Sequence, residues 1–430
     1  MSNSGRKEWW FERLLRGPAA GDDAETLQTT HFVPDHISKV PGGQAATTVR
    51  RPARRVVVNL VSGTASLGLK VHQHLAEAEP EKNLLVSPVS LQLVLAMATT
   101  GAKGKTREEL TRALGADRIL AEDWHACYTN LLQTLRYAAQ DQPLTLGNSA
   151  WITSGYHLSA EFRQAVTDSF DGEARSLGGV DPAAQINAWA AEKTGGKIAQ
   201  LLDGLSDEQR LILISCLYFR GVWANPFEER DTKQETFHAP SGDQKRPFMH
   251  LESHFNYFED EGTQAISLRY GSRGGLVCFV VLPSRRLGLR EFLRRLQPSF
   301  WYSLRNAAGY REGSLALPRF RIESSKRLNE SLQAAGIRRA FDPKESDFSG
   351  IICEPDPVWI GTAQQNTYLE VNEKGTEAAA ASFLDMPCLA AMDPGVPPPP
   401  FEMVVDRPFF CAIGDVASGL ILFTASVWSV

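Results

Sequence analysis

The sequence predicts a mixed α/β protein with a large, mainly antiparallel sheet. Three observations lead to this fold class. Segments with helical spacing mostly precede a second half that is rich in short apolar runs of strand length, and the sequence contains no internal repeat. At 430 residues and 43% hydrophobic content, the chain can also bury a large core.

Helices are expected first along the chain. The apolar segment from Leu84 to Ala98 is opened by Ser87-Pro88, and a serine followed by a proline in the first turn is a typical helix start. Residues 121–138 and 183–202 also have helical spacing. We therefore expect a helix in each of these segments.

Strands are expected to follow. Residues 211–219 and 276–282 are near-continuous apolar runs, which are too short for core helices and typical of buried strands. Residues 315–322 alternate as a strand does. The tail from residue 403 to 430 holds two apolar strands, which are separated around Gly414-Asp415.

The bulk composition limits the classes of function and partner. A net charge of −5 and a pI near 6.0 argue against a nucleic-acid binder. No apolar run approaches the ~20 residues that a membrane span needs. The six cysteines occur singly and the histidines are dispersed, so neither a metal site nor a disulfide framework is expected. Residues 1–55 have little periodicity and form an N-terminal extension that we expect to be largely disordered, which leaves 56–430 as the folded domain.

Common catalytic and nucleotide-binding motifs are absent from the sequence, which contains no GxSxG, HExxH or GxGxxG. The segment from Gly101 to Thr106 imitates half of a phosphate-binding loop. The first glycine of the full motif would fall at Thr99, however, and the preceding segment is expected to be a helix rather than a strand. We therefore do not expect an enzyme.

Two local signals conflict in residues 368–384, because strand-forming residues are followed by the alanine run 378–381, which alone would prefer a helix. If residues 376–386 form a strand, Glu377 and Asp385 share one face. The other face is small or apolar and carries no charge: it consists of Thr376, Ala378, Ala380, Ser382, Leu384 and Met386. Such a strand is slim enough to enter a packed sheet, and Gly375 supplies the backbone freedom for a hinge at its root.

Five short motifs in chain order resemble those of the serpins, the serine protease inhibitors of the antitrypsin type. The resemblance covers residues 56–430. The segment from Gly101 to Thr106 is one of the five motifs, so it is no longer interpreted as part of a phosphate-binding loop. The motifs are Asn83-Leu84-Leu85-Val86-Ser87-Pro88-Val89-Ser90, Gly101-Ala102-Lys103-Gly104-Lys105-Thr106, Tyr218-Phe219-Arg220-Gly221-Val222-Trp223 with Pro226-Phe227, Asp347-Phe348-Ser349-Gly350-Ile351, and Asp406-Arg407-Pro408-Phe409-Phe410.

The resemblance implies a fold of three sheets and eight or nine helices, with an exposed reactive-centre loop at about residues 373–402. In inhibitory members the target protease cleaves this loop and is trapped as an acyl-enzyme, while the loop inserts into the central sheet. The hinge of the loop would comprise Glu373, Gly375, Thr376, Glu377, Ala378, Ala379, Ala380, Ala381 and Ser382.

The hinge predicts an inhibitor that acts as a suicide substrate, because none of the hinge residues on the face that would be buried on insertion is bulky or charged. The alternative is a non-inhibitory serpin, which would be a hormone carrier or a hormone precursor. Those members usually have charged or bulky hinge residues.

Family spacing places the bond that the protease cleaves between Leu389 and Ala390, with the bond between Cys388 and Leu389 as an alternative. Leucine suits a protease with an apolar primary pocket, which predicts a chymotrypsin-like or elastase-like target. A thrombin-like target is also open, because a serpin that inhibits thrombin presents leucine after Met-Pro. In this chain Met386-Pro387 precedes Cys388, which is the reason for the alternative bond. Residues 393–400 make the loop longer than usual beyond the bond.

One polar cluster departs from the family pattern. Serpins usually have an asparagine where Ser215 stands and a histidine where Gln365 stands, and these side chains bond beneath the opening of the sheet near the position of Ser90. Ser215 and Gln365 can still form a polar pair, in which the side chain at 215 is shorter and the side chain at 365 longer than in the usual pair. Two interpretations stay open: drift within a satisfied polar cluster, or an altered threshold for opening the sheet.

Heparin accelerates several inhibitory serpins through a basic helix, and two segments of this chain are candidates for such a site. The helix expected at 121–138 carries only Arg136 and gives no support. The second candidate is a row of arginines with helical spacing, Arg286, Arg290, Arg294 and Arg295. A solvated helix face is the alternative interpretation of this row.

The remaining predictions concern location and modification. The N-terminal extension resembles that of secreted members, so an extracellular location is expected, although the sequence has no signal peptide. Asn329 lies in the one glycosylation sequon. Cys388 in the loop is expected to be exposed, and most other cysteines to be buried. We expect a monomer whose partner is its target protease.

Overall fold

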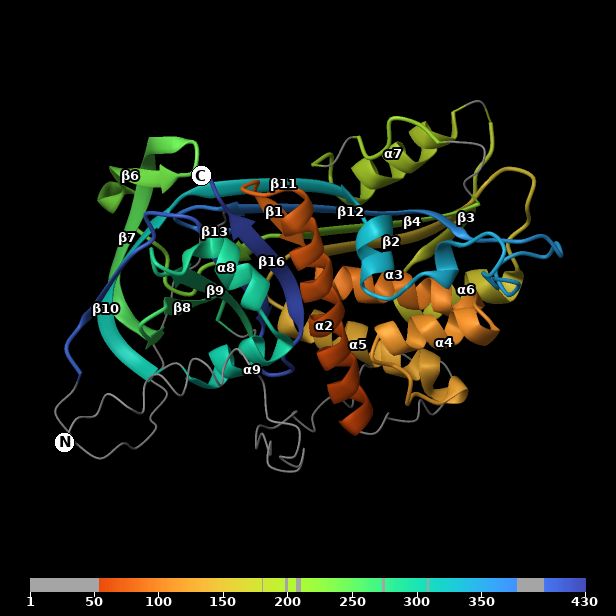
Figure 1. Ribbon diagram of the computed structural model, residues 1–430, viewed down its shortest axis with the longest axis horizontal. Helices are drawn as coiled ribbons and strands as arrows, with labels where there is room; N and C mark the ends of the chain where they lie inside the picture. The colour runs from red at the N-terminus through yellow and green to blue at the C-terminus, as the bar shows by residue number, and fades with distance from the viewer. Residues whose placement is uncertain are drawn as a thin grey trace.

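The computed structural model describes residues 54–179, 181–197, 200–205, 210–272, 275–307, 309–376 and 398–430. Within these ranges nine α-helices and three sheets form an elongated body (Figure 1), which confirms the predicted fold class. None of the described helices is long and apolar enough to cross a membrane. The predicted extension lies outside the described residues up to residue 53.

Three of the nine described helices lie in the segments for which the sequence predicted a helix. Ser87 caps the N-terminus of α3, where its side chain accepts a hydrogen bond from the backbone N–H of Ser90. The helices are α2 (Arg54–Ala78), α3 (Pro88–Gly101), α4 (Gly104–Ala113), α5 (Trp124–Ala138), α6 (Ala160–Phe170), α7 (Pro182–Lys193), α8 (Gly288–Arg295), α9 (Pro298–Ala307) and α10 (Asn329–Ala334).

Three of the helix boundaries differ from prediction. The apolar segment predicted to hold a helix begins with the short strand β1 (Leu84–Val86), although the helix itself starts at Ser87-Pro88 as predicted. Residues 121–123 form a 3₁₀ turn before α5. The helix predicted over 183–202 ends at Lys193, because Gly195 and Gly196 have positive φ angles of 58° and 79°. The apolar pattern alone does not show these ends.

The larger sheet has nine strands and is mainly antiparallel. The predicted strand 276–282 is confirmed as β9, whereas the tail holds three strands instead of two because Pro408 interrupts it. In spatial order the strands are β1, β16 (Ile421–Val427), β15 (Phe409–Asp415), β9 (Leu276–Pro283), β8 (Thr263–Arg269), β7 (Gly242–Glu259), β10 (Gly309–Pro318) and β14 (Phe401–Val404), with β6 (Lys233–Ala239) paired to β7.

The second sheet has five strands, and it confirms the predicted strand 211–219 as β4 (Leu211–Phe219). The strand predicted over 315–322 is wrong, because Arg319 separates β10 from β11, which lie in different sheets. The order is β11 (Phe320–Arg327), β12 (Ile360–Val371), β4, β2 (Leu144–Ile152) and β3 (Glu173–Ser176). The third sheet pairs β13 (Gly375–Thr376) with β5 (Gly221–Val222).

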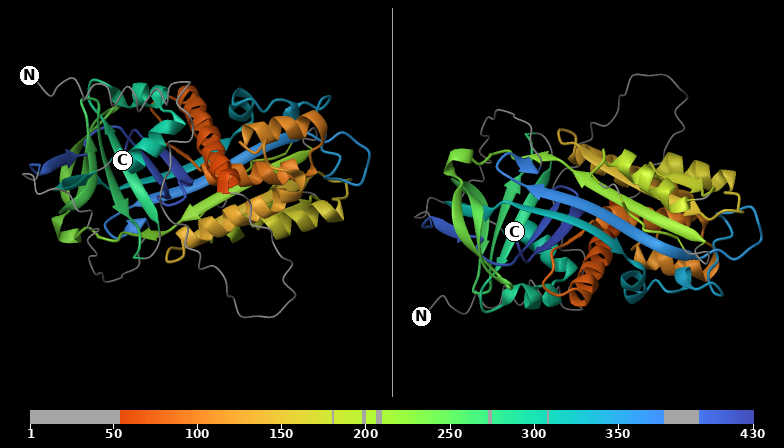
Figure 2. Two further views of the ribbon diagram at one scale, coloured as in Figure 1. Left: turned by 90° about the horizontal axis from the view of Figure 1, so that it is seen from below. Right: turned by 90° about the horizontal axis from the view of Figure 1, so that it is seen from above.

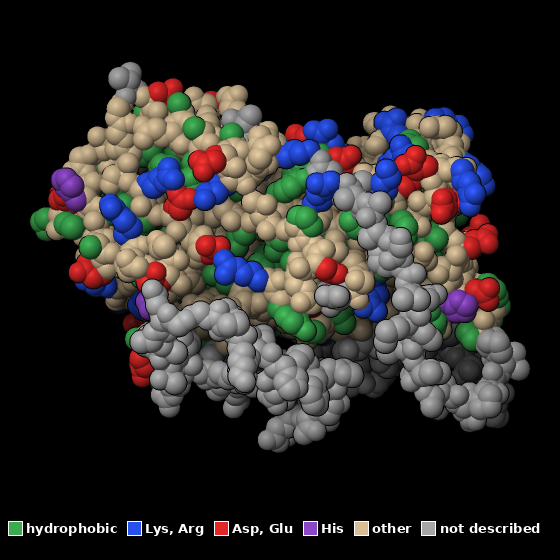
Figure 3. Space-filling view, turned by 180° about the vertical axis from the view of Figure 1, so that it is seen from behind, with side chains coloured by type: hydrophobic (Ala, Val, Ile, Leu, Met, Phe, Trp, Pro, Cys, Tyr) green, Lys and Arg blue, Asp and Glu red, His purple; other side chains and the backbone are tan. Residues whose placement is uncertain are grey.

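Helices cover both faces of the five-stranded sheet (Figures 1 and 2). Successive residues of β4 alternate between them. Ile212 and Ile214 pack with Trp189 of α7 on one face, and Leu213 joins the core that includes α3 on the other. Strands buried on both faces explain the near-continuous apolar run in the sequence. The face of the molecule that points away from the viewer in Figure 1 shows basic and acidic side chains interspersed (Figure 3).

Candidate functional site: the hinge and the seam of the five-stranded sheet

The predicted reactive loop leaves the five-stranded sheet at the end of β12 and rejoins the fold before β14. Its middle, residues 377–397, lies outside the described residues. The predicted residues in this part are therefore without a structural description: Glu377, Ala378, Ala379, Ala380, Ala381, Ser382, Cys388, Leu389 and Ala390. The structure does place both flanks of the loop and the first hinge residues, Glu373, Gly375 and Thr376.

The hinge is held against the segment that follows β4. Gly375 pairs with Val222 and Thr376 with Gly221, and the backbone N–H of Trp223 donates to the carbonyl of Lys374 at 3.0 Å. Gly375 has a φ of 141°, and a Cβ there would collide with the carbonyl of Gly221. Only glycine fits this close approach, which gives the predicted hinge residue its structural reason.

Glu373 fastens the hinge through its carboxylate. Its Oε1 accepts hydrogen bonds from Thr232 Oγ1 at 2.6 Å and from Arg319 Nε at 2.7 Å. Burial opposes ionisation of Glu373, but these hydrogen bonds outweigh it and hold the pKa of the carboxyl group below its usual value. The charged form of Glu373 is therefore part of the fastened hinge. Nothing in the local sequence around Thr232 or Arg319 marks them as partners of the hinge.

Thr376 is fastened by an aromatic residue. Its Oγ1 lies 2.8 Å from the hydroxyl of Tyr270, and both residues are fully buried. Tyr270 stacks on Trp223 with 4.4 Å between ring centroids and meets Phe219 edge-on at 5.0 Å. The tyrosine hydroxyl is thus held rigidly, and it holds Thr376 away from the interior of the five-stranded sheet.

The centre of the five-stranded sheet is a seam between two parallel strands, β12 and β4. Their register runs from Ile360 opposite Leu211 to Tyr368 opposite Tyr218. A segment that follows β12 and folds back would run antiparallel to β12, and therefore antiparallel to β4 as well. Antiparallel pairing is slightly the more stable per residue. The topology thus allows one more strand to enter at the seam.

The predicted polar cluster lies beneath this seam, but not with the predicted pairing. Gln365 Oε1 accepts from the N–H of Ser87 at 2.8 Å, and its Nε2 donates to the Ser87 carbonyl at 2.9 Å and to Ser90 Oγ at 3.0 Å. Ser215 lies opposite Gln365 in register, yet its hydroxyl has no partner in the part of the chain that the structure describes. The predicted Ser215–Gln365 pair is wrong, because α3 already satisfies the amide of Gln365.

A residue that sequence analysis missed extends this cluster. Asn148 of β2 is paired in register with Ser215, and both residues are 1% exposed. Neither atom of the Asn148 amide finds a hydrogen-bond partner among the described residues. Unpaired buried polar atoms destabilise a fold by about 1–3 kcal/mol each. On the face of the sheet that carries Gln365, the unpaired groups therefore lie on β4 and β2, whereas on the other face Asn366 of β12 is itself unpaired among the described residues.

The arginine row predicted for heparin is partly neutralised by acidic neighbours. Arg290 forms an ion pair with Glu81 at 2.9 Å, whereas Arg294 and Arg295 both pair with Glu291, at 3.2 and 2.7 Å. Arg286 precedes the first residue of α8. The four cations lie together at one helix, but three of them already have a carboxylate partner.

Asn329 is engaged within the fold. Its Nδ2 donates to the carbonyl of Gly361 at 2.8 Å, and its Oδ1 accepts from the N–H of Ala363 at 2.9 Å. Ser331 of the same sequon is 2% exposed. Because a glycan would have to be attached at the Nδ2 atom that bonds Gly361, the fold argues against glycosylation of Asn329.

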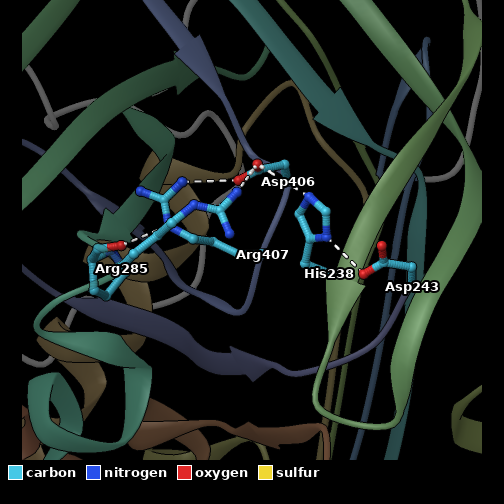
Figure 4. A network of polar contacts seen from close by, with 6 residues as sticks. His238, Asp243, Arg285, Asp406 and Arg407 are labelled. Atoms are coloured by element: carbon cyan, nitrogen blue, oxygen red, sulfur yellow. Dashed lines mark hydrogen bonds and ion pairs between the residues drawn. The ribbon is translucent and has the colours of Figure 1, made fainter.

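The chain after the loop is fastened by a second charged network (Figure 4). Asp406 accepts from Arg285 at 2.6 Å and from Arg407 at 2.8 Å, and its carbonyl accepts from the N–H of His238 at 2.7 Å. Arg407 also donates to the carbonyl of Pro283 at 3.0 Å. The Asp406-Arg407 motif therefore ties the far end of the loop to β6 and to the end of β9.

Most of the cysteines other than Cys388 are buried, as predicted. Cys127, Cys216, Cys278 and Cys411 are buried, whereas Cys353 is exposed and was not singled out by the sequence. Burial raises the pKa of the Cys127 thiol to about 11 and that of Cys216 to about 12.

Comparison with known proteins identifies the family. The family model described as serpin (serine protease inhibitor) matches residues 62–430. An uncharacterized serpin-like protein of Thermococcus kodakarensis is 35% identical over 79% of each chain, and serine protease inhibitor 42Dd of Drosophila melanogaster is 31% identical over 80% of this chain and 91% of its own. The native structure of the thermophilic serpin tengpin has a TM-score of 0.77 at 25% identity and covers 89% of this chain and 96% of its own. The chain therefore belongs to the serpin family, whose members are generally protease inhibitors rather than enzymes.

Proposed function

We propose that this serpin inhibits a serine protease as a suicide substrate. The observation that carries the proposal is the parallel seam between β12 and β4, with the loop attached to the end of β12. Once the loop is cut, the part that follows Thr376 is free to fold back along β12. In that position it pairs with both central strands at once.

Insertion then competes with hydrolysis of the acyl-enzyme. The protease is linked through its serine to the new carboxyl end of the loop and moves with it as the strand enters the sheet. Free energy that the native fold holds in reserve is released in this step. The uncharged face of residues 376–386 supports fast insertion, since no charge on that face has to lose its water.

The intact protein needs a device that keeps the loop out. The contacts of Glu373 and Thr376 supply it, because they hold the hinge on β5 instead of in the seam. They are few and polar, so a cut loop that gains a whole strand of hydrogen bonds can replace them.

The target is proposed to have an apolar primary pocket that accepts Leu389, as chymotrypsin-like and elastase-like enzymes do; a thrombin-like target stays open only through the resemblance at Met386-Pro387. A protease panel tests both function and target. Incubation with each enzyme should give a complex that survives boiling in detergent, together with a released C-terminal peptide that begins at Ala390. A peptide that begins at Leu389 would assign the alternative bond, and cleavage without a stable complex would contradict inhibition.

A non-inhibitory role as hormone carrier or precursor is the alternative. It predicts a loop that is cut without insertion, so the cut and intact proteins would have the same melting temperature. The uncharged hinge face favours the inhibitor.

Two further parts of the proposal concern the setting. We propose an extracellular location, which the N-terminal extension supports by its resemblance to secreted members. We propose heparin as an accelerator at Arg286, Arg290, Arg294 and Arg295. Because three of these must exchange a carboxylate for a sulfate, we expect less than about tenfold acceleration, which should vanish at high salt.

A further inference from the structure

The C-terminal flank of the loop carries a clamp made by one arginine. Arg311 of β10 donates from Nε to the carbonyl of Pro399 at 2.8 Å. Its guanidinium lies over the rings of Tyr257 and Phe401, at 5.5 and 5.9 Å from their centroids, and 3.9 Å from the carboxylate of Glu259. One side chain therefore contacts the loop end, the strand β14 after it, and β7, the strand on the other side of β10 in the same sheet.

The sequence around Arg311 leaves room for this clamp. Phe401 stacks on Tyr257 with 3.7 Å between centroids and 5° between planes. Gly313 lies opposite Phe401 in register, and a Cβ there would collide with the ring. Gly309 lies opposite Tyr257. Gly313 thus leaves the space beside Arg311 that the ring of Phe401 occupies, whereas the space next to Gly309 is open.

The clamped segment is stiff. Residues 398–400 are all proline and all exposed, so they have no apolar burial to hold them in place. Proline fixes φ, and consecutive prolines form an extended helix that rises about 3.1 Å per residue. A stiff segment that is fixed at its base transmits that fixed direction to the chain attached to it.

We propose that Arg311 is a positioning residue for the reactive loop. By holding Pro399, it aims the proline segment and so sets where the bond at Leu389 is presented to the protease. This inference rests on the proposed inhibitory function. It assigns Arg311 to the encounter with the protease and not to insertion, because insertion draws on the other flank.

The role in encounter separates two measurable quantities. Without the clamp, the protease must itself order the flank of the loop, which lowers the association rate. Once the bond is cut, residue 390 onward no longer constrains the inserting arm. The number of inhibitor molecules consumed per trapped protease should therefore stay unchanged.

The test compares Arg311→Ala with Arg311→Lys and with Arg163→Ala, a matched change on the distant helix α6. We expect Arg311→Ala to associate about tenfold more slowly, at unchanged stoichiometry. Arg311→Lys keeps a donor for Pro399 but not the planar group over the rings, and should recover about a third of the wild-type rate. Arg163→Ala should match the wild type.

A second readout works without any protease. Hydrogen exchange of the β14 amides in the intact protein should accelerate in Arg311→Ala, with the melting temperature close to that of the wild type. Unchanged exchange and an unchanged association rate would overturn the clamp. A stoichiometry that rises together with a large loss of melting temperature would overturn it as well, since that result marks a merely structural residue. A wild type that forms no stable complex would contradict the inhibitory function, while the exchange measurement would still decide on the clamp.

Discussion

The two flanks of the reactive loop are fastened in different ways. On the N-terminal side, polar contacts of Glu373 and Thr376 hold a hinge that contains Gly375. On the C-terminal side, Phe401, Met403 and Val405 are buried in the fold, which stabilises that flank by about 1.5–3 kcal/mol for each side chain. Arg311 and the Asp406 network add to that side.

The difference shows which end is built to move. A few hydrogen bonds to a hinge can be exchanged for those of a new strand, so their net loss is small. Buried apolar side chains have no such replacement on leaving the core. A cut loop should therefore release its N-terminal arm and keep its C-terminal fragment in place.

The largest effect is expected from a charge on the inserting face. Ala380→Glu would place an unpaired carboxylate under the sheet, whereas Ala379→Glu places it on the other face of the same arm. We expect Ala380→Glu to raise the stoichiometry of inhibition at least about tenfold, because a slower arm lets the acyl-enzyme hydrolyse. Equal stoichiometries of inhibition for the two variants, measured by titration of protease activity, would contradict the prediction that only one face of the arm is buried on insertion.

The next effect concerns the hinge contacts. Glu373→Gln removes the charge that Arg319 and Thr232 hold, which should weaken the hinge by roughly 1–2 kcal/mol. Inhibitory activity should then decay about tenfold faster on warming, as the uncut arm enters the seam. The control is Glu323→Gln, which breaks the exposed ion pair with Arg321. Decay as slow as in the wild type would show that the hinge is held elsewhere.

Acid should loosen the same hinge. The pKa of Glu373 is lowered from 4.5, so its stabilisation is complete above about pH 4.5 and is lost as the pH falls through the lowered value. Burial also lowers the pKa of His72 from 6.5 to about 3, which weakens the whole fold as the pH falls over that range. The effect on the hinge is therefore measured as a ratio: the rate at which the inhibitory activity of the wild type decays, divided by the rate for Glu373→Gln. This ratio should rise severalfold below pH 4.5, and a constant ratio would count against the carboxylate.

The smallest effect is expected at the seam. Ser215→Asn offers the amide of Asn148 a longer partner beneath β4, which should stabilise the native sheet by about 1 kcal/mol. Insertion should slow two- to fivefold, seen as a modest rise in stoichiometry and in the melting temperature of the uncut protein. Insertion faster than in the wild type would mean that the unpaired groups of Ser215 and Asn148 do not make the sheet easier to open.

Much of the fold could be predicted from the sequence, because buried strands such as β4 and β9 are continuous apolar runs and Ser87-Pro88 marks a helix start. The hinge glycine could also be predicted, since only one residue type fits there. The partners of the hinge could not. Arg319, Thr232 and Tyr270 come from three distant segments, and no local pattern links them to Glu373 and Thr376. The Ser215–Gln365 pair was predicted wrongly for a related reason. Family spacing gives the positions of the two residues, whereas the length of each side chain decides which neighbour it reaches.

The most direct test of the central claim is the melting temperature of the protein before and after a single cut in the loop by a protease that it does not trap. If the arm enters the seam, the cut protein should melt at least about 10 °C higher, because it gains a fully paired strand. A cut protein that melts at the same temperature as the intact one, or lower, would contradict insertion and the inhibitory mechanism built on it.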